Sequence, residues 1–172
     1  MIITVEDLKK RVTCNDADDL ITTKLEAIEA VIRAYTNNNF QQRSVRFVGR
    51  SEDLNVYGSP RFFTVGDTVQ ISCSGVNDGL YVITAVYDDH IEVDKHLMPV
   101  DVNLVTKIKY PADVIQCAVD LFKWKQTMGD KVGVKSETLS RHSVTYEDSA
   151  TLYMGYPVGI LNGLNLHRKA RC

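Results

Sequence analysis

The side chains that could do chemistry in this chain include a run of carboxylates, Asp16-Ala17-Asp18-Asp19. Carboxylates this close together are candidate ligands for calcium. A calcium loop, however, spreads its ligands over about a dozen residues and needs a sharp glycine turn and a distal glutamate. No such residues follow here. We therefore interpret the run as a helix start, where carboxylates cap free N–H groups and the helix dipole favours negative charge.

The histidines, serines and cysteines form no familiar catalytic or ligand pattern. His90 and His96 have a spacing that suits no common metal geometry, and the chain has neither a Cys-x-x-Cys pair nor a His-Glu-x-x-His segment. His142 lies beside a serine, but such a pair needs a third group that orients the histidine. A Gly-x-x-x-x-Gly-Lys-Ser/Thr phosphate loop does not occur either. The sequence therefore predicts no enzymatic activity, no catalytic residue, no metal site and no cofactor.

Composition and charge limit the possible partners. The 172 residues are 44% hydrophobic and 24% charged, which suits a soluble chain with a buried core. A protein that binds nucleic acid through its phosphates carries a clear excess of Lys and Arg, whereas this chain has a net charge of -2. We expect any contact with DNA to be passive. No secretion signal begins the sequence, and no apolar run approaches the roughly 20 residues that span a bilayer, so we expect no membrane partner.

Helical periodicity marks both ends of the chain. Apolar residues recur at steps of three and four over residues 20–35, and again after Pro111, which suits the first position of a helix. Each helix has a wide apolar face, and the economical solution packs the two faces together. The residues expected in this helical core are Ile21, Leu25, Ile28, Ile32, Ile115, Ala118 and Phe122.

Between these helices the period changes to that of strands. Residues 68–73 alternate apolar and polar side chains, and residues 74–79 are rich in types that tolerate positive φ. Five or six short strands with tight turns predict a small antiparallel barrel or sandwich. The expected fold is therefore α+β. Residues 1–43 and 108–172 form a small α-helical bundle core, and residues 44–107 form an inserted β domain.

A small barrel of this kind is also compatible with a binding module that recognises nucleic acid or a peptide. Such a module needs exposed aromatic and basic side chains on one face. Phe62, Phe63, Tyr81 and Tyr87 are available, but the residues around them are mostly acidic. We therefore favour a core role for these aromatics and keep the binding module as the alternative function.

Several short segments of the helical parts follow one another in an order that is typical of a known family. In chain order they are Val5-Glu6-Asp7-Leu8-Lys9, Asp18-Asp19-Leu20-Ile21, Ala34-Tyr35-Thr36-Asn37, Pro111-Ala112-Asp113-Val114, Ser136-Glu137-Thr138-Leu139, Ser143-Val144-Thr145-Tyr146 and Tyr156-Pro157 followed by Arg168-Lys169-Ala170-Arg171. Their order and spacing resemble those of tailed-phage head–tail connector proteins, also called neck adaptors. The sequence departs from the family pattern at residues 140–142.

The resemblance implies a structural virion protein of the neck, which is present in the host cytoplasm during assembly. It implies a homo-oligomeric ring of about a dozen copies, joined by heterologous contacts. The ring would bind the portal protein on one side and a downstream neck, stopper or tail protein on the other, while DNA passes through its channel without specific binding.

Two sets of residues follow from the resemblance as expected contacts. The portal-docking tail consists of Arg168, Lys169 and Arg171, although a basic terminus is also compatible with simple solvation. The expected subunit interface consists of Lys135, Glu137, Leu139, Val144 and Tyr146.

Overall fold

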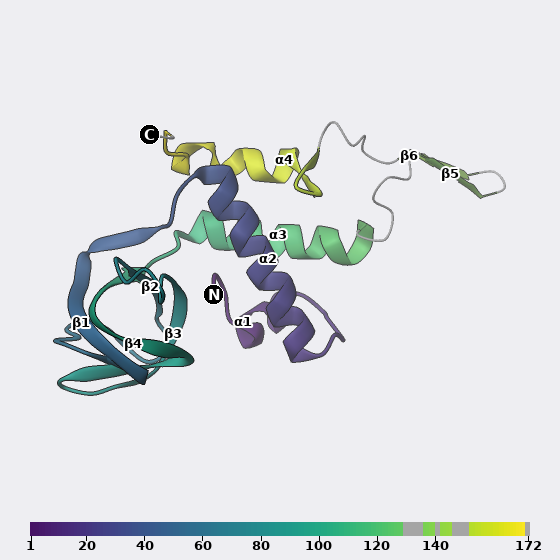
Figure 1. The fold of residues 1–172 in the computed structure, drawn as a ribbon. Helices are drawn as coiled ribbons and strands as arrows, with labels where there is room; N and C mark the ends of the chain where they lie inside the picture. The colour runs from purple at the N-terminus through teal and green to yellow at the C-terminus, as the bar shows by residue number, and fades with distance from the viewer. Residues whose placement is uncertain (129–135, 140–141, 146–151, 171–172) are drawn as a thin grey trace. The chain divides into compact units, whose positions relative to one another are not determined.

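The chain folds into two compact units (Figure 1). The computed structural model covers residues 1–172 and describes residues 1–128, 136–139, 142–145 and 152–170. Met1–Asn38 and Pro111–Cys172 form one unit, here called the helical unit, and Asn39–Tyr110 form the other, here called the β unit. The predicted α+β class is confirmed.

The helical unit contains four α-helices within the described residues. They are α1 (Val5–Lys9), α2 (Asp18–Thr36), α3 (Ala112–Met128) and α4 (Val158–Leu161), and a 3-10 helix, η3 (Asn162–His167), follows the last of them. Thr4 caps α1 because its hydroxyl accepts a hydrogen bond from the backbone N–H of Asp7 at 3.2 Å. None of the described helices combines the length and the hydropathy that a membrane crossing requires.

Helices α2 and α3 lie against each other, and both bury apolar side chains. All four α2 residues named from the sequence are fully buried, and so are Ala118 and Phe122 of α3. Ile115 is only half-buried, and its neighbour Val114 is fully buried instead. Helix α3 has apolar residues on nearly all sides, so its periodicity does not single out one face.

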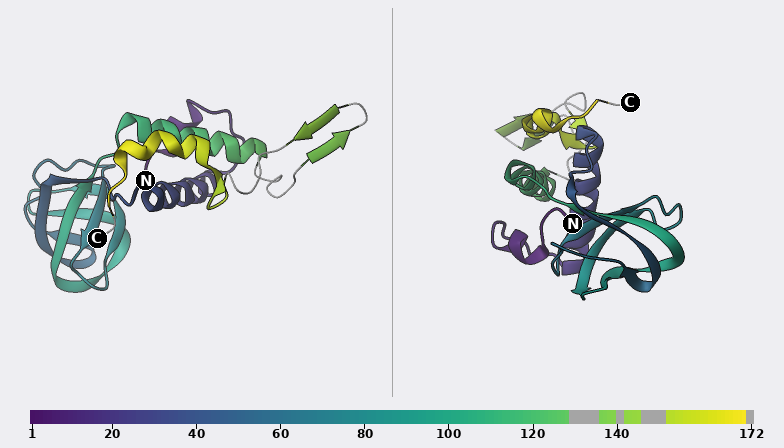
Figure 2. Two further views of the ribbon diagram at one scale, coloured as in Figure 1. Left: turned by 90° about the horizontal axis from the view of Figure 1, so that it is seen from above. Right: turned by 90° about the vertical axis from the view of Figure 1, so that its left-hand side faces the viewer.

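The β unit is one antiparallel sheet of four strands, β1 (Gln41–Tyr57), β2 (Thr68–Ser72), β3 (Gly79–Val86) and β4 (His90–Ile108). Their order is β1-β4-β2-β3, and β3 also pairs with β4. Figure 2 shows the strong curvature of the strands of this unit. One face of the sheet buries its own apolar core. Its members are Phe47, Val56, Phe63, Val69, Ile71, Ile83, Ile91, Val93, Leu97 and Val105.

The predicted closure into a barrel is wrong, since within residues 39–110, all of which the structure describes, the sheet stays open. Strand β1 pairs only with β4. The expected five or six short strands are also fewer and longer, with 17 residues in β1 and 19 in β4. Register shifts interrupt the β1–β4 pairing at several points. Such shifts break the alternation of side chains, so one long bent strand resembles several short ones.

Two glycines, one within β1 and one directly after it, allow the strand to bend sharply. A Cβ atom added to Gly49 would lie 1.9 Å from the carbonyl oxygen of Tyr57, and one added to Gly58 would lie 2.4 Å from the ring of Phe47. Real Cβ atoms essentially never lie within 3.0 Å of such atoms. The two ends of the bend therefore meet only because these positions lack a Cβ.

Two short hairpins follow α3. Strand β5 (Ser136–Leu139) pairs antiparallel with β6 (His142–Thr145), and β7 (Leu152–Tyr153) pairs with β8 (Tyr156–Pro157). Met154 and Gly155, which join β7 to β8, have φ values of 49° and 80°. Positive φ at both central residues is the requirement of a two-residue hairpin turn whose twist matches that of its strands.

Candidate functional site

The predicted portal-docking tail lies against the end of α2. The backbone N–H of Lys169 donates to the carbonyl of Thr36 at 2.8 Å. The Nδ2 of Asn37 donates to the carbonyls of Lys169 and Ala170, at 3.4 and 3.0 Å. Asn37 also holds the left-handed conformation that ends α2, with φ 47°. One residue therefore ends the helix and fixes the main chain of the tail. Arg171 lies outside the described residues.

A tyrosine of α2 holds the segment that leads into the tail. The guanidinium of Arg168 lies 5.2 Å from the centroid of the Tyr35 ring, which is cation–π distance. The Tyr35 hydroxyl lies 3.1 and 3.0 Å from the Oδ1 atoms of Asn162 and Asn165 in η3. Lys169 is exposed, as Arg168 is, but no ring contact is seen for its side chain within the described residues.

An ion pair adds a third attachment. The Nε2 of His167 lies 2.6 Å from Oδ2 of Asp113, near the start of α3. This hydrogen bond holds the pKa of the Asp113 carboxyl below its usual value, with a smaller contribution from the charge of His167. We call Tyr35, Asn37 and Asp113 the C-terminal clamp. The sequence pointed to the basic residues of the tail but not to the residues that hold them.

The predicted subunit interface falls largely on the β5–β6 hairpin. The register places Glu137 opposite Val144, and Leu139 opposite His142. The two segments that the resemblance matched separately are therefore partners in one hairpin. Lys135 and Tyr146 lie outside the described residues.

The β unit carries a stack of planar groups on its surface. The guanidinium of Arg50 lies 4.4 Å from the centroid of the Tyr57 ring. The Tyr57 and His90 rings are 5.2 Å apart, and His90 stacks on Tyr87 with 4.3 Å between centroids and 12° between planes. The Nδ1 of His90 lies 2.7 Å from Oδ1 of Asp89, and this bond lowers the pKa of that carboxyl. The stack joins residues of β1 to residues of the β3–β4 turn.

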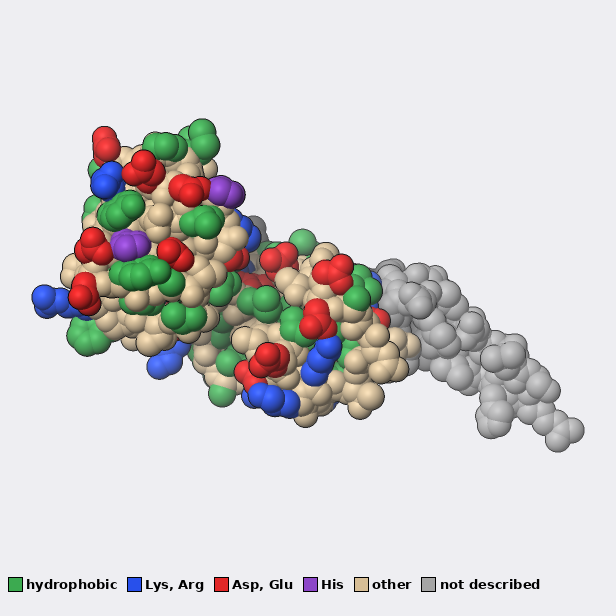
Figure 3. Space-filling view, turned by 90° about the horizontal axis from the view of Figure 1, so that it is seen from below, with side chains coloured by type: hydrophobic (Ala, Val, Ile, Leu, Met, Phe, Trp, Pro, Cys, Tyr) green, Lys and Arg blue, Asp and Glu red, His purple; other side chains and the backbone are tan. Residues whose placement is uncertain are grey.

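The aromatic residues that the sequence assigned to the core have different environments. Phe63 is buried and Tyr81 is half-buried, but 47% of Tyr87 and 79% of Phe62 are exposed. The core assignment is therefore wrong for Tyr87 and Phe62. Figure 3 shows one face of the molecule, on which acidic and apolar side chains lie side by side over the β unit at the left.

The loop of residues 58–67 holds Phe62 in an unusual conformation. Phe62 has φ 70°, which is rare for a bulky side chain. Asp67 fixes the loop, since its Oδ2 accepts hydrogen bonds from the backbone N–H and the hydroxyl of Thr64, at 2.7 and 3.0 Å. Lys107 of β4 bridges to Oδ2 of Asp67 at 2.6 Å and donates to the carbonyl of Phe62 at 3.2 Å. The exposed ring is therefore displayed by a braced loop.

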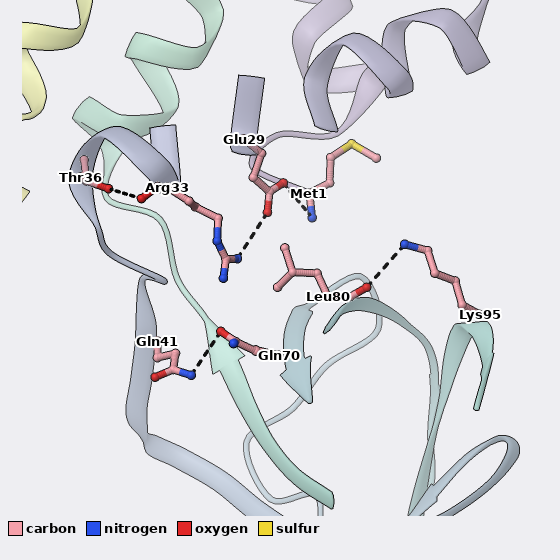
Figure 4. A network of polar contacts seen from close by, with 8 residues as sticks. All are labelled: Met1, Glu29, Arg33, Thr36, Gln41, Gln70, Leu80 and Lys95. Atoms are coloured by element: carbon pink, nitrogen blue, oxygen red, sulfur yellow. Dashed lines mark hydrogen bonds and ion pairs between the residues drawn. The ribbon is translucent and has the colours of Figure 1, made fainter. Parts of the chain in front are cut away.

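Other polar contacts stabilise each unit from within (Figure 4). In the helical unit, the buried carboxylate of Glu29 lies 3.5 Å from the Met1 ammonium and 3.9 Å from the guanidinium of Arg33. In the β unit, the side chain of Gln41 donates to that of Gln70 at 3.2 Å.

Buried amides form a second network in the β unit. The Nδ2 of Asn77 donates to the hydroxyl of Ser51, to the Met98 carbonyl and to Oδ1 of Asn103, at 3.0, 2.9 and 3.3 Å. Its Oδ1 accepts the Met98 N–H at 2.8 Å. Because these groups satisfy one another, the network holds the turn after β2 in place.

The structure brings no three His, Cys, Asp or Glu side chains together in a metal-binding group within the described ranges. Burial raises the pKa of the Cys117 thiol to about 12. A scan against models of known protein families gives no match for this chain, and a search of curated proteins gives none either.

Proposed function

We propose that this chain is a structural, non-enzymatic subunit of a tailed-phage neck, a head–tail connector that assembles as a ring between the portal and the tail. One observation carries the proposal. Every segment of the sequence resemblance lies in the helical unit, on α1, α2, α3, the β5–β6 hairpin and the C-terminal segment. Residues separated by the whole β unit along the chain therefore share one compact unit.

The proposal assigns a small helical bundle as the core of the subunit. Helices α2 and α3 contact each other, and η3 contacts both. Leu161 and Leu164 are buried at this end of the chain. Burying one such side chain contributes about 1.5–3 kcal/mol, so this packing ties the C-terminal segment to the bundle.

Neighbouring copies meet through the β5–β6 hairpin in the proposed ring. Within the described residues, β5 and β6 pair with each other and with no further strand. Each therefore offers an edge whose N–H and C=O groups suit pairing with another chain. A contact that joins two different surfaces of identical copies generates a closed ring when the rotation from each copy to the next adds up to a full turn.

The C-terminal tail docks on the portal in this proposal. The C-terminal clamp fixes the main chain at Lys169 and Ala170, so the exposed Lys169 side chain leaves the helical unit from a defined position. A basic tail held in this way fits an acidic surface of the portal. The net charge of -2 supports passage of DNA through the ring without specific binding, since an excess of basic residues would hold its phosphates.

The test is the native mass of the purified chain, alone and mixed with the portal protein of the same phage, by light scattering after gel filtration. The proposal predicts a ring, or co-elution of the chain with the portal at a fixed ratio. The portal of an unrelated phage is the control for non-specific adsorption. A chain that remains monomeric and elutes apart from its own portal contradicts the proposal.

A second candidate function is a binding module in the β unit. The exposed stack that ends at Tyr87 favours it, because exposed aromatic rings are typical of surfaces that bind nucleobases or peptides. A gel-shift titration of the full chain with single-stranded DNA separates the two functions. The connector proposal predicts no stable complex, whereas the binding module predicts one that weakens with salt.

A further inference from the structure

The aromatic stack of the β unit has one occupied end and one open end. At the first end, Arg50 covers the Tyr57 ring. At the other, Tyr87 is 47% exposed and its hydroxyl lies 3.3 Å from Oε1 of Glu92. Asp88, the next residue, is exposed and makes no ion pair with any residue that the structure describes. The open end therefore combines an exposed ring with unneutralised negative charge. An arginine would fit there as Arg50 fits on Tyr57 at the other end.

The loop of residues 58–67 carries exposed apolar side chains and a positive charge. Phe62 is 79% exposed and Val65 is 64% exposed, and between residues 1–128 no acidic side chain pairs with the exposed Arg61. The loop is braced by Asp67 and Lys107, and Phe62 holds its positive φ there. Strained backbone that the surrounding structure maintains is concentrated at functional surfaces. This loop therefore offers apolar area and positive charge in a fixed arrangement.

The two surfaces are complementary, because one carries the exposed Arg61 and the other carries the exposed Asp88 beside the Tyr87 ring. A guanidinium is well suited to lie over a tyrosine ring and to pair with a carboxylate at the same time. The contact of Arg50 with Tyr57 shows this geometry within the β unit. Arg61 of another copy would repeat it on Tyr87 and pair with Asp88, while Phe62 adds the aromatic area that is enriched at protein interfaces.

We propose that the β units of neighbouring copies join head to tail, with the loop that carries Arg61, Phe62 and Val65 of one copy docked on Tyr87 and Asp88 of the next. The inference rests on the proposed function in that it assigns the β unit a part in the ring. A head-to-tail contact of this kind propagates from copy to copy, whereas a symmetric dimer requires each copy to present both surfaces to the same partner.

Charge reversal in the full chain tests this contact. We expect Arg61→Glu and Asp88→Lys each to weaken self-association about tenfold, because each puts like charges opposite each other. Sedimentation velocity over a concentration series measures the association. Arg46→Glu is the matched control, since Arg46 is an exposed arginine of β1 outside both surfaces, and we expect it to associate like the unchanged chain.

Mixing the two variants gives the sharpest result. Glu at position 61 of one variant faces Lys at position 88 of the other, and the reverse contact keeps the original Arg61 and Asp88. We therefore expect an equimolar mixture to recover self-association, with the two variants alternating. A non-specific effect of charge or a folding defect does not recover on mixing.

Three outcomes overturn the inference: an unchanged chain that stays monomeric, association that ignores both reversals, or a mixture that fails to recover. The proposed function has a separate readout in binding to the portal. A chain that binds its portal while its self-association ignores Arg61 and Asp88 retains the proposed function and loses this inference.

Discussion

At the residue scale, the closest approach in the β unit gives a direct test of its fold. The bend of β1 depends on Gly49, where a Cβ would lie 1.9 Å from a backbone oxygen that belongs to the same strand. We expect Gly49→Ala to lower the free energy of unfolding of the β unit by about 3 kcal/mol or more, since backbone on both sides must move. Chemical denaturation measures the loss.

The control for this substitution is Gly159→Ala. Gly159 lies in α4, and a Cβ added there meets no heavy atom within 4 Å. Alanine in a helix is about 1 kcal/mol more favourable than glycine. We expect Gly159→Ala to leave stability unchanged or higher, and equal losses at both positions would contradict the close approach at Gly49.

The ion pair between Asp113 and His167 gives a pH dependence whose sign is fixed. The pKa of the Asp113 carboxyl is held below its usual value of 3.8 in the folded chain. On the acid side, the stabilising contribution of the ionised carboxyl is therefore present above that value and is lost as the pH falls through the lowered pKa. We expect His167→Ala to raise the Asp113 pKa toward 3.8, as measured by NMR titration of the carboxyl carbon. An Asp113 that titrates identically in both proteins would exclude the ion pair.

At the element scale, the end of α2 couples a helix stop to the position of the tail. Asn37→Gly keeps the left-handed backbone accessible but removes the hydrogen bonds to the carbonyls of Lys169 and Ala170. We expect the Lys169 amide, which donates to Thr36, to exchange its hydrogen faster in this variant. Exchange within α2 serves as the internal control. Equal protection of Lys169 in both proteins would show that Asn37 does not hold the tail.

The sequence predicts the helices of this chain better than its strands, for a physical reason. A buried helix face repeats within a few residues, so the spacing of Ile21, Leu25, Ile28 and Ile32 is enough to identify it. Strand pairing joins distant residues, so neither the bends of β1 nor the open sheet could be predicted from local alternation. The same limit applies to the stack, because Tyr57 and His90 become neighbours only through the β1–β4 register.

The contacts of the C-terminal tail were also predictable only where they involve residues that are close in sequence. The basic tail was visible because Arg168 and Lys169 are adjacent along the chain. Its clamp was not, because Tyr35 and Asp113 are far from it in sequence. Within α3, the sequence could not show which of Val114 and Ile115 is buried, because this helix is apolar on nearly all sides.

At the scale of the whole molecule, the tail provides a test of portal docking. We expect Arg168→Glu with Arg171→Glu to weaken binding to the portal by tenfold or more, because two basic side chains become acidic. Co-elution with the portal measures the change, and protection of the Lys169 amide reports whether the clamp remains intact. Arg11→Glu with Lys123→Glu is the control, with the same change in charge at exposed positions elsewhere in the helical unit. Undiminished portal binding in the tail variant would exclude the docking role.

The two ends of the β unit lie side by side. The N–H of Lys109 donates to the carbonyl of Phe40 at 3.0 Å, and the rings of Phe40 and Tyr110 are 5.1 Å apart. The chain therefore leaves this unit next to the point where it enters. A short turn could replace everything between these residues without stretching the chain. The β unit is thus joined to the rest of the chain as an inserted domain is, with its two ends adjacent, which is the arrangement under which a domain is added or removed without separating the segments on either side.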